Sequence, residues 1–320
     1  MNMKKVLRLF FAAAVLLGLA SCNSNDDFGS QVIEIPGITI DESDADCCSA
    51  EEALAVYNFL QTLKPIEGVG LEVDGQYKVR VYSRTGSLHT GYNDLYFVAT
   101  KVSSGNYIKF LDITNLTPLM FMSKMNMYHS TPTSGEVGVF DINLAAVKHG
   151  WVSFLMNTSG AGSWTLAFDA VVLKKKSSLE ATSITVDALP DGQQWLKNFK
   201  VGDQTYFLSV VNPTDWQTGT NTITAYVSQK SSPITTPYAL AQEQFTIEID
   251  PRMPDMGNHS SPDNTPLILK SDSSYQGSIN LTMTGRWRIH LTVKDAQGNI
   301  VAGGDDLDEG YSSLFWEVTI

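Results

Sequence analysis

The sequence predicts an all-β protein in which two β-sandwiches follow one another behind a short N-terminal helix. Two observations carry this prediction. Beyond residue 65, short runs alternate apolar and polar residues with period two, as in 76–82, 165–171 and 286–293, and Gly, Asn, Asp and Pro separate them. In addition, motifs of the first half of the chain recur in the second half, in the same order, which is typical of an internal repeat.

The N-terminal residues 1–21 have the layout of a secretory signal peptide. Lys4, Lys5 and Arg8 precede an apolar run that is too short to span a bilayer. The run ends in Leu19-Ala20-Ser21-Cys22, which resembles the lipobox of bacterial lipoproteins. The resemblance implies cleavage before Cys22, acylation of Cys22 and anchoring in a membrane, expected to be the outer membrane with the body on its periplasmic or cell-surface side. The alternative is an ordinary signal peptide with an incidental cysteine.

Residues 22–48 read as a polar, acidic tether between the acylated cysteine and the folded body. The tether ends in the adjacent pair Cys47-Cys48, which could close only a strained ring with each other. Thiolate ligands, a redox pair, mixed disulfides and plain buried side chains all remain open for this pair.

A helix is predicted over 49–64. Ser49 is a candidate N-cap with Glu52 three residues later, and Pro65 stops the helix. Apolar residues then follow with a partial helical period, at Leu54, Val56, Tyr57, Leu60 and Leu63. We expect this helix to brace the first β-sandwich.

The internal repeat divides the rest of the chain into two β domains over 65–187 and 188–320. The offset between matched motifs stays between 123 and 135 residues, so it drifts only by loop-sized steps. The matched motifs are 73–76 with 201–204, 89–93 with 217–221, 129–132 with 259–262, Met156 with Met283, 162–164 with 285–287, and 177–179 with 312–314.

The composition excludes several classes of partner and scaffold. A net charge of -12 and an isoelectric point near 4.8 argue against nucleic acid as a partner, because phosphate binding needs clustered Lys and Arg. Three cysteines are too few for a disulfide scaffold. With 43% apolar residues, the chain has enough hydrophobic side chains for a core.

The second repeat carries the stretch 253–259, Met-Pro-Asp-Met-Gly-Asn-His, and about 24 residues after it the stretch 283–289, Met-Thr-Gly-Arg-Trp-Arg-Ile. These motifs resemble those of the YtkA-like/FixH-like immunoglobulin-like β-sandwich domains, over roughly residues 200–295. The first repeat departs from the pattern, since Met122-Ser123-Lys124-Met125 stands where the second has Met-Pro-Asp-Met. The resemblance implies an immunoglobulin-like fold and, less directly, a role in copper handling.

Two groups of methionine and histidine are the candidate metal ligands. Thioether sulfur is a soft, uncharged donor, so methionine together with histidine suits Cu(I). An extended backbone would place Met125, Met127 and His129 on one face, whereas a loop turning around a point would bring the second group together. The candidate ligands are Met125, Met127, His129, Met253, Met256 and His259. The alternative is that these methionines fill the cores of the sandwiches.

The sequence has no Gly-x-Ser-x-Gly elbow, no His-Glu-x-x-His, no phosphate loop and no dinucleotide-binding motif, and its five histidines are scattered. Paired carboxylates for glycoside hydrolysis stay open, because they would come from different strands. We therefore predict no enzyme and no catalytic residues. The leading prediction is a tethered extracytoplasmic binding protein, with Cu(I) as its one possible cofactor. The alternatives are a surface module that binds a protein or a glycan, for which Trp195 and Trp216 are candidate sugar-stacking residues if exposed, and a structural spacer.

Overall fold

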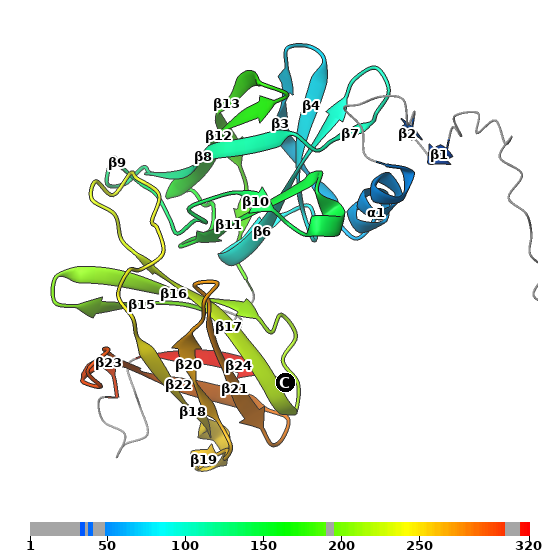
Figure 1. Cartoon of the computed structure of the whole chain (residues 1–320). Coiled ribbons are helices and arrows are strands. Elements are labelled where there is room, and N and C mark those ends of the chain that lie inside the picture. Colours follow the sequence, from blue (N-terminus) through cyan, green and yellow to red (C-terminus); the bar gives the residue numbers. More distant parts are fainter. Residues whose placement is uncertain (1–32, 36–37, 41–48, 190–194, 305–313) are drawn as a thin grey trace, which may run out of the picture.

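A computed structural model describes residues 33–35, 38–40, 49–189, 195–304 and 314–320. In these residues the chain is all-β with one short α-helix, which confirms the predicted all-β sandwich fold (Figure 1). The first unit comprises residues 64–189 and the second unit residues 195–304 and 314–320. The described part of the chain contains no helix with the length and apolar character needed to cross a bilayer.

Helix α1 (Ala50–Leu60) begins as the sequence predicts, because Ser49 and Glu52 form a capping box in which each side chain accepts the backbone N–H of the other residue. It ends four residues earlier than predicted, since Lys64 already starts the first long strand. Leu54, placed on the apolar face by its spacing, is exposed instead. Ala53 and Val56 make the buried contact.

The first unit packs two antiparallel sheets face to face. The larger sheet has the order β10-β11-β6-β4-β3 with β7 on β6, and the smaller has the order β13-β12-β8-β9. A short parallel pair places β14, the last strand of the unit, beside β5, which precedes β6. The strands are β3 (Lys64–Val73), β4 (Tyr77–Ser83), β5 (Leu88–His89), β6 (Gly91–Lys101), β7 (Tyr107–Ile108), β8 (Leu111–Met122), β9 (Met127–His129), β10 (Gly138–Val139), β11 (Val147–Phe154), β12 (Gly162–Val172), β13 (Lys175–Ile184) and β14 (Val186–Asp187). A 3-10 turn, η1 (Ile142–Leu144), precedes β11, and the pair β1 (Ile33–Ile35) and β2 (Ile38–Ile40) lies N-terminal to α1.

The second unit has one continuous set of pairings, in the order β15-β16-β17-β21-β20-β18-β22-β23, with β19 on β18 and β24 on β22. Its two layers are linked because β20 pairs with both β18 and β21. The elements are β15 (Leu196–Val201), β16 (Gln204–Asn212), β17 (Gly219–Gln229), β18 (Thr246–Met253), η2 (Pro254–Met256), β19 (His259–Ser260), β20 (Thr265–Leu269), β21 (Tyr275–Leu281), β22 (Arg286–Lys294), β23 (Ile300–Gly303) and β24 (Phe315–Thr319).

The strand orders of the two units correspond. β3-β4-β6-β11 in the first unit has the same arrangement as β15-β16-β17-β21 in the second, and β9-β8-β12 has the same arrangement as β19-β18-β22. Trp164 on β12 and Trp287 on β22 are both fully buried, and their indole N–H groups donate to the carbonyls of Met156 and Met283. The sequence matches therefore fall at equivalent positions, except that the match of 177–179 with 312–314 lies partly outside the described residues.

The matched loops before β6 and β17 are closed in the same way. The Asn93 side chain accepts the backbone N–H of His89 at 2.9 Å, and that of Asn221 accepts the N–H of Gln217 at 3.0 Å. Each amide also donates to the carbonyls four and two residues earlier. The glycine between them, Gly91 in one loop and Gly219 in the other, has a φ near the left-handed range, 82° and 89°.

The two units are held together by backbone and side-chain contacts. A segment of the second unit reaches back to the first, where the Ser130 N–H donates to the Ile234 carbonyl at 2.7 Å and the Tyr238 N–H to the Thr131 carbonyl at 3.0 Å (Figure 1). Between β11 of the first unit and β16 of the second, the hydroxyl of Ser153 donates to that of Ser209 at 2.7 Å. These contacts hold the two units in one arrangement relative to each other.

Candidate functional site

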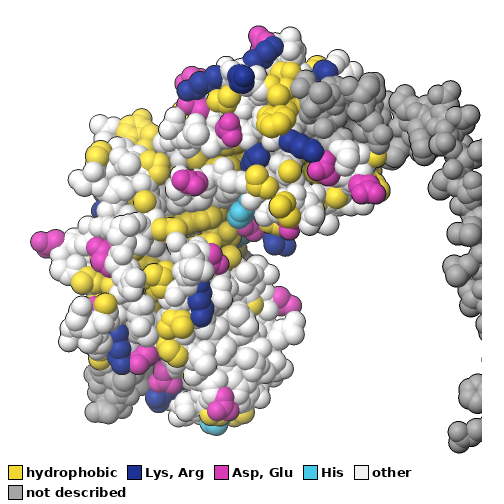
Figure 2. Space-filling model, viewed as in Figure 1, with side chains coloured by type: hydrophobic (Ala, Val, Ile, Leu, Met, Phe, Trp, Pro, Cys, Tyr) yellow, Lys and Arg dark blue, Asp and Glu magenta, His cyan; other side chains and the backbone are white. Residues whose placement is uncertain are grey.

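A cleft of about 550 Å³ lies between the two units. Figure 2 shows the notch between the upper and lower parts of the molecule, with hydrophobic side chains and a histidine at its edge. The first unit contributes a loop over 83–90, the start of β6, Phe140 and His149. The second unit contributes Trp195, the end of β16 and, from β17, Thr224 and Tyr226.

The side chain of Asp94 is the polar centre of the cleft. Its Oδ1 accepts hydrogen bonds from the Tyr92 hydroxyl and from Nε2 of His149, both at 2.8 Å. Its Oδ2 lies 3.6 Å from Nε of Arg84, whose side chain is exposed at the rim. Burial alone would raise the pKa of the Asp94 carboxyl, but the hydrogen bonds from His149 and Tyr92 and the charges of His149 and Arg84 together outweigh burial and lower that pKa. Asp94 is therefore an ionised carboxylate, fixed by hydrogen bonds, that orients the side chains of Tyr92 and His149.

Aromatic rings form the walls of the cleft and join the units. The rings of Trp151 and Tyr226 stack across the boundary with centroids 4.9 Å apart and planes 7° apart. The ring centroids of Tyr92 and Tyr226 are 6.1 Å apart, with planes 29° apart. The ring centroids of Tyr96 and His149 are 5.1 Å apart. Burial, and then the Asp94 charge, raise the pKa of Tyr92 strongly and that of Tyr96 to about 12, so both hydroxyls stay protonated.

The β6 strand presents these groups because its side chains alternate between two faces. Asn93, Leu95 and Phe97 face the core of the first unit and are buried. Tyr92, Asp94 and Tyr96 therefore share the opposite, outer face. At the far end of this face, α1 covers the sheet, where Val56 and Tyr96 belong to one apolar cluster. The face is thus covered by α1 at one end and borders the second unit at the other.

The predicted tryptophan pair behaves only in part as expected. Trp216 is buried in the core of the second unit with 7% of its surface exposed, so it is unavailable for sugar stacking. Trp195 is partly buried, packs against Trp216 with ring centroids 6.0 Å apart, and lines the cleft. The prediction is wrong for Trp216 because the indole is needed to fill the core beneath Trp195.

The first methionine and histidine group forms only part of the extended strand that the alternation predicts. Asn126 has a left-handed φ of 47°, which turns the chain between Met125 and Met127. Met125 is exposed, whereas His129 is half-buried with its Nδ1 2.7 Å from the Ser130 carbonyl oxygen and its ring edge-on to Trp164. Met127 and His129 share one face of β9, as the alternation predicts, but the turn at Asn126 places Met125 outside this strand.

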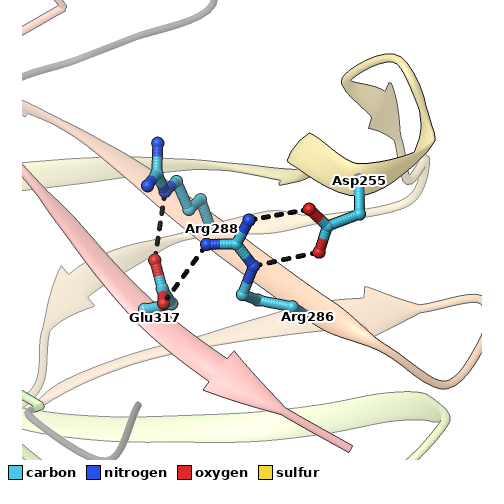
Figure 3. A network of polar contacts seen from close by, with 4 residues as sticks. All are labelled: Asp255, Arg286, Arg288 and Glu317. Atoms are coloured by element: carbon cyan, nitrogen blue, oxygen red, sulfur yellow. Dashed lines mark hydrogen bonds and ion pairs between the residues drawn. The ribbon is translucent and has the colours of Figure 1, made fainter. Parts of the chain in front are cut away.

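In the second group the members differ sharply in exposure. Met253 is 2% exposed in the core of the second unit, Met256 is 55% exposed in η2, and His259 is exposed on β19. Figure 3 shows how the turn is held: both carboxylate oxygens of Asp255 accept bonds from Arg286, at 3.0 and 2.8 Å. Arg286 and Arg288 also pair with Glu317 on β24 (Figure 3).

The strand register corrects the alignment of the two methionine groups. Met253 pairs with His259 as Met120 pairs with His129, so Met120 rather than Met122 is the counterpart of Met253. Both methionines are buried, and their methyl ends occupy the space where Gly162 or Gly285 lacks a side chain. This shared packing role explains why methionine occurs at both positions.

The remaining predicted positions lie elsewhere. Cys22, Cys47 and Cys48 fall outside the described residues, as does the signal peptide. Within the described ranges, no three His, Cys, Asp or Glu side chains gather as a metal site. Methionine is not one of these four residue types, so copper binding by the methionine groups stays a prediction.

The sequence reasoning missed the cleft residues on β6 and β11. One signal was available in the repeat itself: Tyr92, Asp94 and Tyr96 stand where the second repeat has Thr220, Thr222 and Thr224. Aromatic and charged residues on the non-core face of one copy, with threonines in the other, mark a specialised surface. The pairing with His149 could not be seen, because it depends on the β6–β11 register.

No protein-family model matches the chain, and no curated protein matches it. The resemblance to YtkA-like/FixH-like domains therefore stays a prediction. Among solved structures, the chain is similar at 10% identity to a Bacteroides ovatus mixed-linkage glucan utilization locus SGBP-B in complex with a mixed-linkage heptasaccharide, over 80% of this chain and 70% of that one, with a TM-score of 0.18. A second structure, BspA_C_WT, has 6% identity over 81% and 99% of the two chains and a TM-score of 0.14. Both similarities are too remote to transfer a ligand.

Proposed function

We propose that the protein is a membrane-tethered extracytoplasmic binding protein that holds a glycan in the cleft between its two units. The observation that carries this proposal is the cleft itself, in which aromatic rings from both units surround a hydrogen-bonded carboxylate. Ligand sites are typically concave, with apolar and aromatic walls and a few converging polar groups.

The chemistry of the cleft matches that of a sugar ring. A pyranose ring has one face of C–H groups, which packs on an aromatic ring, and an equator of hydroxyls that donate and accept hydrogen bonds. Tyr92 and Tyr226 supply rings that are partly exposed in the cleft. Arg84, His89 and Asn212 supply donors and acceptors around them.

The same residues favour binding over hydrolysis. Glycosidases ordinarily use a pair of carboxyl groups on either side of the scissile bond. Among the described residues that line the cleft, Asp94 is the single carboxylate, and its lowered pKa makes it a poor proton donor. A ligand in this cleft would therefore be bound and released unchanged.

Glycan-array binding followed by calorimetry on the purified body tests this proposal. Tyr226→Ala removes a ring from the cleft and should weaken binding of the captured glycan by about tenfold, which corresponds to about 1.4 kcal/mol of binding free energy. Tyr128→Ala is the matched control, because Tyr128 is an exposed tyrosine on β9 away from the cleft. Equal binding by both variants, or no glycan bound by the wild type, would overturn the proposal.

The tether belongs to the same proposal and has its own test. Full-length protein should incorporate labelled palmitate in a bacterial host and partition with the membrane fraction, since acyl chains on Cys22 supply the anchor. Cys22→Ser should abolish the label. Label that persists in the variant would contradict acylation at this residue.

Copper(I) remains a second candidate ligand on the strength of the sequence. Met256 and His259 are exposed on neighbouring parts of one turn, whereas Met253 is buried. An anaerobic Cu(I) competition titration should show binding that Met256→Ala weakens without changing stability by more than about 0.5 kcal/mol. Met253→Ala should cost about 2–5 kcal/mol of unfolding free energy whether or not copper binds. No competition with a weak chelator would contradict copper binding.

A further inference from the structure

The outer face of β17 leads directly out of the cleft. Tyr226 and Thr224 line the cleft, and Thr222 and Thr220 follow on the same face because side chains of a strand alternate. Ile223, Ala225 and Val227, on the opposite face, are buried in the core of the second unit. A ligand that leaves the cleft along this strand therefore meets threonine hydroxyls.

The neighbouring strand β21 widens this surface with side chains of the same kind. Thr220, Thr222 and Thr224 pair across the ladder with Asn280, Ser278 and Gln276, and the register runs without a shift from Gly219 to Ala225. We call these six residues the β17–β21 face. Thr220 and Thr222 are exposed, and the other four are half-buried. At about 3.3 Å per residue, the three rows cover about 13 Å along the strand from Thr220 to Thr224.

The face is uncharged in a strongly acidic protein. All six side chains are hydroxyls or amides, whereas the chain carries a net charge of -12. Figure 2 shows the lower unit beside and below the notch as a broad white area, the colour of the backbone and of side chains that are neither charged nor hydrophobic. The β17–β21 face therefore suits a partner that is neutral and rich in hydroxyl groups.

We infer that the cleft binds one part of a neutral, extended polysaccharide chain and that the β17–β21 face binds the residues that follow. This inference rests on the proposed glycan binding in the cleft. A ladder with an unbroken register repeats the same spacing along the strands, which matches a β-1,4-linked chain, which is extended, better than an α-1,4-linked chain, which curves. Hydroxyls and amides can both donate and accept, so each row can bind a sugar residue through its hydroxyls.

The test is the dependence of affinity on chain length. Calorimetry with cello- and xylo-oligosaccharides, from disaccharide to octasaccharide, should show affinity that rises with length in the wild type. Thr222→Ala/Ser278→Ala removes two hydroxyls that could bond the sugar, so it should weaken octasaccharide binding by about tenfold while leaving disaccharide binding unchanged. Thr319→Ala, on the exposed end of β24, is the control for an exposed strand threonine.

The outcomes separate this inference from the proposal on which it rests. If affinity is the same at every length, or if the double variant binds the octasaccharide as the wild type does, the β17–β21 face is not a subsite, although the cleft still binds sugar. If only malto-oligosaccharides or acidic glycans bind, and Tyr226→Ala weakens them, glycan binding stands and the neutral extended chain is wrong. If no glycan binds at all, both are wrong.

Discussion

The outer faces of the equivalent sheets in the two units differ in composition: aromatic and ionisable residues in the first unit, uncharged polar residues in the second. In the first unit, the face of β6 and β11 carries Tyr92, Asp94, Tyr96, His149 and Trp151, and it is covered by α1 or borders the second unit. In the second unit, the corresponding positions on β17 and β21 carry threonine, serine, asparagine and glutamine, and these side chains are exposed or half-buried.

The inner faces, by contrast, are alike. Both cores use alternating Val, Ile, Leu and aromatic residues around a buried tryptophan whose N–H is bonded to a methionine carbonyl. A shared core therefore specifies the sandwich. The outer face can differ between the units because it is covered in the first unit and largely open in the second, where substitutions of exposed residues change stability little. Three predictions test this division, beginning with the largest expected effect.

Replacement of the core tryptophans should damage both units equally. Trp164→Ala and Trp287→Ala each remove a fully buried ring and its hydrogen bond, so each should lower the free energy of unfolding of its unit by about 3–5 kcal/mol. Urea unfolding followed by circular dichroism measures this. A much smaller loss in one variant would show that the two cores are not equivalent.

A substitution on the outer face should lower the free energy of unfolding markedly in the first unit and hardly at all in the second. Tyr96→Thr gives the first unit the residue of its counterpart Thr224, and it removes a ring that packs on Phe59 and Phe140 at centroid distances of 5.2 and 5.1 Å. The expected loss is about 3 kcal/mol. Thr222→Ala, on the exposed face, should change the unfolding free energy by less than about 0.5 kcal/mol. Similar losses in both variants would contradict the comparison.

The half-buried carboxylate of Asp94 should make the free energy of unfolding of the first unit depend on pH. Since the pKa of Asp94 is lowered in the folded state, its contribution to the free energy of unfolding is complete above the unfolded pKa of about 3.9 and is lost as the pH falls through the folded pKa. Asp94→Asn should cost about 2 kcal/mol at neutral pH, because bonds to a charged group are lost, and nothing once the carboxyl is protonated.

The counterpart substitution supplies the control for this pH effect. Thr222→Asp introduces a carboxylate at the equivalent but exposed position, where solvent screens its charge. Its unfolding free energy should follow that of the wild type between pH 3 and 7. A constant difference between Asp94→Asn and the wild type across this range would mean that the Asp94 charge does not stabilise the fold.

The sequence by itself determined the features that depend on local patterns. Period-two alternation and the internal repeat predicted an all-β fold, and the capping residues Ser49 and Glu52 predicted where α1 begins. Other features depended on packing between distant segments. The burial of Trp216 and Met253, the turn at Asn126 and the early end of α1 follow from tertiary contacts that no local spacing encodes.

The candidate site was decided by tertiary structure alone. Asp94 meets His149 only through the register of β6 with β11, and Trp151 meets Tyr226 only because the two units dock. A period-two pattern shows which residues share a face, but it does not show which face will be covered, since that depends on elements more than fifty residues away. The repeat predicted two similar cores, and the packing of one unit on the other made their outer faces different.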